Sequence, residues 1–310
     1  MIAYVLRRVL WSIPLLLIVI LVTFALMRGS GGNPFQPPEG YLGVPPALEN
    51  QLRDYYNLDA PWFVEYLTYV RHIFTLQFGP SLLNRYVTVD DVMRTSFPIT
   101  LELVLLAAAW ALPLGIGLGV LAASRRGTVA DFLATSTAST LLVIPVFFVA
   151  YVFSTYLVRD WGLFPFGWDT WQARILPSLA LALAPTGYIA RLVRSAVVET
   201  LNEDYVRTAR AKGLGVERIL WVHVFRNSLV PLLSAAMPML ALLITGALFV
   251  EQFFGIPGAA TTFLDAARTR DYPLLLGLTV GLAGIVLAAN LVADIVLALI
   301  DPRVRESERT

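Results

Sequence analysis

Long runs without a charged residue are the feature that most constrains how this 310-residue chain can fold. A helix needs about 20 apolar residues to cross the hydrocarbon core of a membrane. The six runs cover residues 9–27, 103–124, 132–158, 175–190, 227–250 and 272–293. The fourth is the shortest, so its helix has to extend past the charge that ends it or stop near an interface. The sequence therefore predicts an all-α integral membrane protein with six transmembrane helices.

Arginine and lysine flank these runs unevenly, and such residues concentrate on the cytoplasmic side of membrane proteins. With the N-terminus inside, the basic residues at positions 7–8, 125–126, 191–226 and 303–309 all face the cytoplasm. We therefore expect a multi-pass protein of the cell (inner) membrane with both termini cytoplasmic. The first apolar run is longer than the core of a signal peptide, so we interpret it as a retained helix.

This topology divides the chain into four parts. The expected parts are an N-terminal transmembrane helix (1–28), an extracytoplasmic segment (29–98), a five-helix transmembrane core (99–300) with a cytoplasmic loop at 195–227, and a cytoplasmic tail (301–310). Charged residues make up only 15% of the chain, against about 25% in ordinary soluble domains, which supports the membrane interpretation.

The extracytoplasmic segment contains two helical patterns, "PALENQLRDYYNLD" and "PWFVEYLTYVRHIFTLQFG". In the second, helical spacing aligns apolar residues along one stripe. They are Trp62, Tyr66, Tyr69, Val70 and Phe74. Aromatic stripes of this kind suit the membrane surface, while a role in gripping substrate stays open.

Several kinds of chemistry are absent from the sequence. There is no phosphate-binding G-x-x-x-x-G-K-[ST] motif, no H-E-x-x-H and no G-x-S-x-G, and the chain has no cysteine. Its two histidines, His72 and His223, fall on opposite sides of the membrane in the expected topology, so they cannot share a metal ion. We therefore expect no catalytic residue, metal site or cofactor-binding site in this chain.

A few residues within the spans stand out. Pro145, Pro185 and Gly187 interrupt helices and are candidates for a translocation pathway, although bends needed for packing explain them equally well. A bridge between Arg191 and Asp294 would pair two charges near the inner interface, with a gating role as the alternative.

Small residues four positions apart let transmembrane helices approach each other closely. Two such pairs occur, Gly115 with Gly119 and Gly277 with Gly281. We therefore expect each pair to lie at a helix contact.

The stretch "LNEDYVRTARAKGLGVERILWVHVFRN" (201–227) is polar and basic between two apolar runs. Asn202 suits the N-cap of a short helix, and Gly213 suits its left-handed end. A helix of this length is marginal alone in water, so it needs a surface to pack on. Docking into a partner and lying against anionic lipid both remain possible from the physics alone.

The sequence of this stretch resembles the EAA loop, or coupling helix, of ABC transporter permeases. Arg207, Thr208 and Ala209 occupy the acidic-Ala-Ala triplet, and Gly213 occupies the glycine. "EDYVRTARAKGL" followed by "HVFRNSLVP" resembles the dipeptide/oligopeptide/nickel (binding-protein-dependent) importer family, as do "LRDYYNLDAPWFVEYLTYV", "VEQFFGIPG" and "DPRVR". "SGGNP" differs from the usual Pro-Gly-Asp-Pro of the family, and "FGIPG" from its aromatic-Pro-Gly.

The resemblance implies a type I ABC importer permease fold and transport by alternating access. It implies a second homologous permease, with a heterodimer expected, two cytoplasmic ATPase subunits that hold ATP and Mg, and an external substrate-binding protein. The residues it assigns to ATPase docking are Glu203, Asp204, Tyr205, Arg207, Thr208, Ala209, Arg210, Lys212, Gly213 and Leu214.

The resemblance favours dipeptides or oligopeptides as cargo, with nickel chelates or oligosaccharides as alternatives. A stand-alone ion-coupled secondary transporter and a structural membrane anchor are alternatives from other classes. The first would need ionisable residues in the middle of the membrane, and this chain has almost none.

Overall fold

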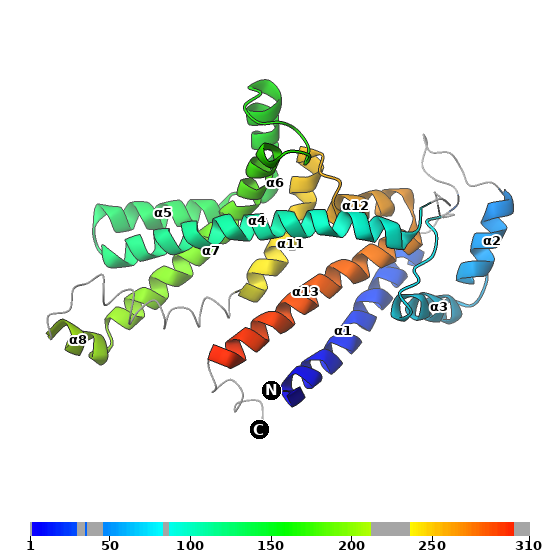
Figure 1. Ribbon diagram of the computed structural model, residues 1–310, viewed down its shortest axis with the longest axis horizontal. Coiled ribbons are helices and arrows are strands. Elements are labelled where there is room, and N and C mark those ends of the chain that lie inside the picture. The colour runs from blue at the N-terminus through cyan, green and yellow to red at the C-terminus, as the bar shows by residue number, and fades with distance from the viewer. Residues whose placement is uncertain (1, 30–34, 36–45, 83–86, 212–235, 301–310) are drawn as a thin grey trace. The chain divides into compact units, whose positions relative to one another are not determined.

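The computed structural model describes residues 2–29, 35, 46–82, 87–211 and 236–300. Apart from an isolated bridge between Pro80 and Thr88, the regular structure in these ranges is helical. The helices, labelled in part in Figure 1, are α1 (Ile2–Gly29), α2 (Pro46–Tyr56), α3 (Trp62–Phe74), α4 (Val89–Ser124), α5 (Val129–Val143), α6 (Val146–Val152), the π-helix η1 (Phe153–Asp160), α7 (Trp171–Leu201), α8 (Asp204–Ala211), α11 (Ala236–Phe254), α12 (Ala259–Thr269) and α13 (Tyr272–Ile300).

Four of these helices, α1, α4, α7 and α13, are long and apolar enough to cross a membrane by themselves. Two further candidates are bent pairs, 129–143 with 146–160 and 242–254 with 259–269. If each pair crosses once, the described residues supply the six expected spans. The two short helices expected between the first two spans are also confirmed as α2 and α3.

The third apolar run is broken rather than gently kinked. Its two halves meet at an angle of 92°, and Pro145 lies at the corner as the N-cap residue of α6. Proline has no backbone N–H and disfavours a helical conformation in the residue before it. Ile144 accordingly adopts an extended conformation, with ψ of 122°. The bend therefore follows from one residue, whereas run length alone predicts a continuous span.

The chain forms two compact units, one of residues 1–101 with 257–288 and one of residues 102–256 with 289–310. In the first unit, buried side chains from α1, α2, α3 and α13 form one core. Its largest fully buried members include Ile20, Tyr56, Leu276 and Leu278. The Tyr56 hydroxyl lies within hydrogen-bond distance of the carbonyls of Phe78 and Pro80, which fixes the turn that leads towards α4.

A buried aspartate holds the same turn against the start of α13. Asp271 is 2% exposed and accepts hydrogen bonds from the hydroxyl of Ser81 and the amides of Leu82 and Leu274. Buried carboxylates are costly unless their lone pairs are satisfied. These bonds therefore join the segment after α3 to the segment before α13, which are far apart in sequence.

In the second unit, α7 is the central helix. In its most apolar stretch 61% of the residues are buried, against 11% in α1, so α7 packs among helices of this chain. The short fourth run predicted from the sequence becomes a helix that continues past Arg191 and Arg194 to Leu201. A charged side chain ends an uncharged run without ending a helix, because it can extend towards the interface.

Both glycine pairs lie at helix contacts, as expected. A Cβ atom added at Gly119 would lie 2.6 Å from the carbonyl oxygen of Ala190 in α7, and one at Gly115 would lie 2.7 Å from Ile189. Gly277 and Gly281 meet side chains of α4 in the first unit. These approaches are too close for any residue with a side chain. Gly117, two residues from Gly119, has no such neighbour within 4 Å.

We expect Gly119→Ala to destabilise the protein by about 1–3 kcal/mol, because overpacking against a backbone carbonyl forces α4 and α7 apart. Gly117→Ala is the matched control and should be neutral or stabilising by up to about 1 kcal/mol, since alanine is the better helix former. Thermal unfolding of both variants in lipid nanodiscs measures this difference. Equal effects at the two positions would contradict the described packing.

Candidate functional site

The candidate coupling segment begins where α7 ends. Asn202 is the C-cap residue of α7: its amide bonds the carbonyl of Glu199, and its side chain donates to the carbonyl of Val198 at 3.0 Å. The expectation that Asn202 caps the start of the next helix is therefore wrong. Its side chain satisfies a carbonyl of the preceding helix, which the last turn of a helix leaves unpaired.

Helix α8 follows at Asp204 and ends at Ala211, so the predicted short helix is confirmed. Among its residues whose side chains are described, Val206 is fully buried, whereas Asp204, Tyr205 and Thr208 are exposed, as is Glu203 just before it. Thus one apolar side chain anchors the helix, and the other described side chains of α8 are exposed. Of the other predicted docking residues, the side chains of Arg207, Ala209 and Arg210, and the whole of Lys212, Gly213 and Leu214, lie outside the described residues.

A second feature, which the sequence did not indicate, ties α7 to α5. Arg194 donates to both carboxylate oxygens of Asp131, from Nε at 2.8 Å and from Nη2 at 2.9 Å. The same carboxylate accepts the Gly127 amide at 3.0 Å and the Thr135 hydroxyl at 3.1 Å. Its lone pairs are thus fully used, and the side chain of Asp131 is only 10% exposed. Paired N–H···O bonds between a guanidinium and a carboxylate fix orientation as well as distance.

One partner of this ion pair, Arg194, lies close to α8 along the chain. Arg194 is in the last three turns of α7, and α8 begins immediately beyond the Asn202 cap. Asp131 is in the first turn of α5. Further along the same two helices, a Cβ atom at Gly187 would collide with the carbonyl oxygen of Ala138. Helices α5 and α7 are therefore held at two levels, by charge near one end and by close backbone contact further in.

The three pathway candidates occupy different settings. Pro145 is the corner between α5 and α6, while Pro185 and Gly187 are buried within α7. The contact of Gly187 with α5 is itself sufficient reason for a glycine there. None of the three lines the cavity of about 420 Å³ that the second unit holds beside η1. That cavity is walled by Tyr151, Ser154, Thr155, Val158, Arg159, Phe164, Phe166 and Phe253.

The predicted Arg191–Asp294 pair stays a prediction. Arg191 is exposed and Asp294 is half-buried. The arginine at the C-terminal end of α7 whose ion-pair partner the structure shows is Arg194, one turn after Arg191. Within the described residues, no group of three or more His, Cys, Asp or Glu side chains is arranged to hold a metal ion.

Comparison with known proteins matches residues 115–306 to the family described as "Binding-protein-dependent transport system inner membrane component". The chain is 35% identical over 303 residues to the dipeptide transport system permease protein DppB of Bacillus subtilis, with 97% of each chain covered. It is also 35% identical over 309 residues to the oligopeptide transport system permease protein OppB of Salmonella typhimurium, covering 98% of this chain and all of that one.

Solved structures with a similar fold belong to ABC transporters. An inward-facing MetNI methionine ABC transporter superimposes with a TM-score of 0.58 at 17% identity, over 68% of this chain and 96% of that one. An amino acid ABC transporter gives a TM-score of 0.51 at 15% identity, over 68% and 94%. At these identities the likeness concerns the fold, and it agrees with the type I importer architecture expected from the sequence.

We expect Asp131→Ala and Arg194→Ala each to lower the midpoint of thermal unfolding in nanodiscs. The double variant should be no less stable than the more damaged single variant, because both changes break the same interaction. Glu199→Ala, at an exposed acidic residue of the same helix, serves as the control and should leave the midpoint unchanged. Strictly additive effects of the two alanines would show that the pair contributes nothing as a unit.

Proposed function

This chain belongs to the family of binding-protein-dependent inner membrane components, the permease subunits of ABC importers, and on that premise we propose that it forms part of the membrane path of a peptide importer. Relatives that match it over nearly their whole length are named dipeptide and oligopeptide permeases, which supports this substrate class. Nickel chelates and oligosaccharides are the alternatives within the family.

The permease does not itself hydrolyse ATP, because in ABC importers that reaction belongs to separate ATPase subunits. Such importers combine permeases, ATPases and a substrate-binding protein. For this chain we propose a heterodimer with a second, related permease, two cytoplasmic ATPase subunits that hold ATP and Mg, and one external binding protein. We propose further that both termini and α8 lie in the cytoplasm, which the basic residues beside the spans support.

The observation that carries the mechanism is the short exposed helix α8 placed directly after the buried helix α7. We propose that the segment from Glu203 to Leu214 docks into an ATPase subunit. When ATP closes the two ATPases, the docked segment moves and α7 moves with it. ATP shifts the permease towards the outward-facing state only to the extent that the ATPase contacts favour that state.

The Asp131–Arg194 pair passes the movement of α7 on to a second helix, α5. Since the guanidinium holds the carboxylate through two parallel bonds, a displacement at the cytoplasmic end of α7 carries the first turn of α5 with it. Helix α5 leads to the 92° break at Pro145. We therefore propose that α5 and α7 move together as one rigid pair. The break at Pro145 would then bend to absorb the difference in movement between α5 and α6.

A stand-alone ion-coupled transporter is disfavoured by the distribution of charge. Two ion pairs of the second unit, Asp131 with Arg194 and Glu102 with Arg174, lie at or just beyond the edges of the uncharged runs rather than within them. Ion-coupled carriers bind their ions near the middle of the bilayer.

Gly213→Val should abolish transport-coupled ATP hydrolysis while membrane insertion stays normal. A β-branched residue cannot readily take the left-handed conformation that the sequence predicts at Gly213. The measurement compares ATP hydrolysis and uptake in proteoliposomes that contain the complete transporter. Gly117→Val, on an open face of α4, is the control and should retain both activities. Normal uptake by the Gly213→Val transporter would refute the docking assignment.

Substrate class is tested with the same proteoliposomes. With the binding protein and ATP present, we expect uptake of radiolabelled dipeptides or oligopeptides and competition by unlabelled peptides. A labelled nickel chelate and a labelled oligosaccharide are run in parallel. ATP-dependent uptake of either of these, without uptake of peptide, would overturn the peptide assignment and leave the family assignment intact.

A further inference from the structure

Helix α3, in the segment between the first two spans, uses two faces in different ways. Glu65, Tyr69 and Ile73 are buried against the rest of the first unit. Large apolar side chains on other positions stay exposed, with Leu67 at 59%. The exposed set is Trp62, Phe63, Leu67 and Phe74. The single aromatic stripe expected from the sequence is thus divided, since Tyr69 is buried and Tyr66 half-buried while Trp62 and Phe74 point outward.

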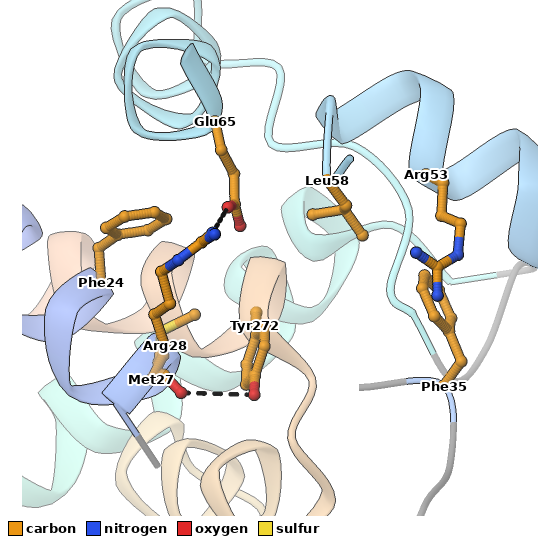
Figure 2. Close-up of a pocket in the computed structure, with 8 residues that line it drawn as sticks. All are labelled: Phe24, Met27, Arg28, Phe35, Arg53, Leu58, Glu65 and Tyr272. Atoms are coloured by element: carbon orange, nitrogen blue, oxygen red, sulfur yellow. Dashed lines mark hydrogen bonds and ion pairs between the residues drawn. The ribbon is translucent and has the colours of Figure 1, made fainter. Parts of the chain in front are cut away.

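Contacts with α1 show how deep α3 lies. The Tyr66 hydroxyl donates to the carbonyl of Leu17 at 3.2 Å, and the Phe24 ring lies 5.7 Å from that of Tyr66. At the other end Arg28 bonds the carboxylate of Glu65, as Figure 2 shows. Figure 1 shows α3 beside the C-terminal end of α1 and at an angle to it. These contacts place α3 alongside the stretch of α1 from Leu17 to Arg28.

That stretch lies in the membrane. The uncharged run of α1 covers residues 9–27, so Arg28 marks one edge of the hydrocarbon core. Leu17 precedes Arg28 by about 16 Å along the helix, at 1.5 Å per residue. This is about half the thickness of a hydrocarbon core of roughly 30 Å. The Tyr66 hydroxyl therefore reaches towards the middle of the bilayer, and the body of α3 lies in one leaflet.

The span beside α3 also carries exposed apolar side chains. Leu26 of α1 is 69% exposed, and Val22 and Ile18 are also exposed. Arg71, exposed on α3 between Leu67 and Phe74, can keep its alkyl stem among acyl chains and extend its guanidinium to the phosphates. Tryptophan and arginine are common at the level of the headgroups. A water-soluble partner could not reach side chains at the depth that α1 defines.

We infer that α3 is embedded in the outer leaflet, with Trp62, Phe63, Leu67 and Phe74 against phospholipid acyl chains and Arg71 at the phosphates. The segment after the first span is then partly a membrane element, so lipid supports the position of α1. The embedding follows from the contacts of α1 with α3, while the choice of leaflet rests on the orientation given under Proposed function. Failure of the peptide assignment would leave both untouched.

The absence of native cysteine makes a direct test possible. Single cysteines replace Phe63, Leu67 or Phe74, each labelled with an environment-sensitive fluorophore in the complete transporter. The transporter is placed in nanodiscs of phosphatidylcholine and phosphatidylglycerol, with or without lipids that carry a doxyl group on the acyl chain. We expect blue-shifted emission and loss of fluorescence with the doxyl lipids. Matched cysteines at Gln51 and Asp54, exposed on α2, should show neither effect.

Two fluorescence results would overturn the inference. One is fluorescence that doxyl lipids leave unchanged and that aqueous iodide quenches, which would place the face of α3 in water. The other is fluorescence that iodide quenches only while the binding protein is absent. Protection by the added binding protein would make the face a docking surface for that protein. As a second measurement, Leu67→Asp should reduce the amount of protein inserted in the membrane, while Gln51→Asp should not. Normal insertion of Leu67→Asp would also contradict embedding.

Discussion

Within hydrocarbon, a polypeptide has to satisfy its backbone hydrogen bonds inside its own segments, and the other features of this structure follow from that constraint. It makes the chain helical, and it makes each break in a helix a place where other groups supply the missing bonds. At the break after α11 the Gly167 amide bonds the carbonyl of Phe254, and the Ile256 amide bonds that of Glu251. At the start of α12 the Ala259 amide bonds the hydroxyl of Thr100.

The same constraint makes α7 suitable as a lever. A long helix with its bonds satisfied internally is stiff, and α7 is also the most buried of the four straight spans. Its C-terminal end leads into α8, and its Arg194 holds Asp131 of α5 by a two-point bond. Force applied at α8 thus reaches two helices rather than one. The anchoring of α8 itself is modest, with Val206 its one buried side chain among those described. Such a helix suits a segment whose main contacts are with a partner.

The sequence predicted much of this fold because a helix that crosses the membrane needs a long apolar run, which is easily recognised. Apolar runs predicted the spans, helical spacing predicted α2 and α3, and glycine spacing predicted a helix contact at Gly115 and Gly119, although not that α7 is the partner. The Asp131–Arg194 pair could not be predicted, since 63 residues separate the partners and neither stands in a distinctive motif. Asn202 was assigned to the wrong helix because an amide side chain suits either end of a helix, and only the path of the chain decides between them.

The central claim is that the segment after α7 seats in an ATPase subunit and moves α7 and α5 together. The most direct test is a pair of electron cryomicroscopy structures of the complete transporter in nanodiscs, one without nucleotide and one with ATP trapped. The account predicts α8 in a groove of the ATPase in both states, with α5 and α7 displaced as one body and the Asp131–Arg194 bonds kept. Structures in which α8 touches only solvent or lipid headgroups, or in which α7 moves while α5 stays in place, would contradict it.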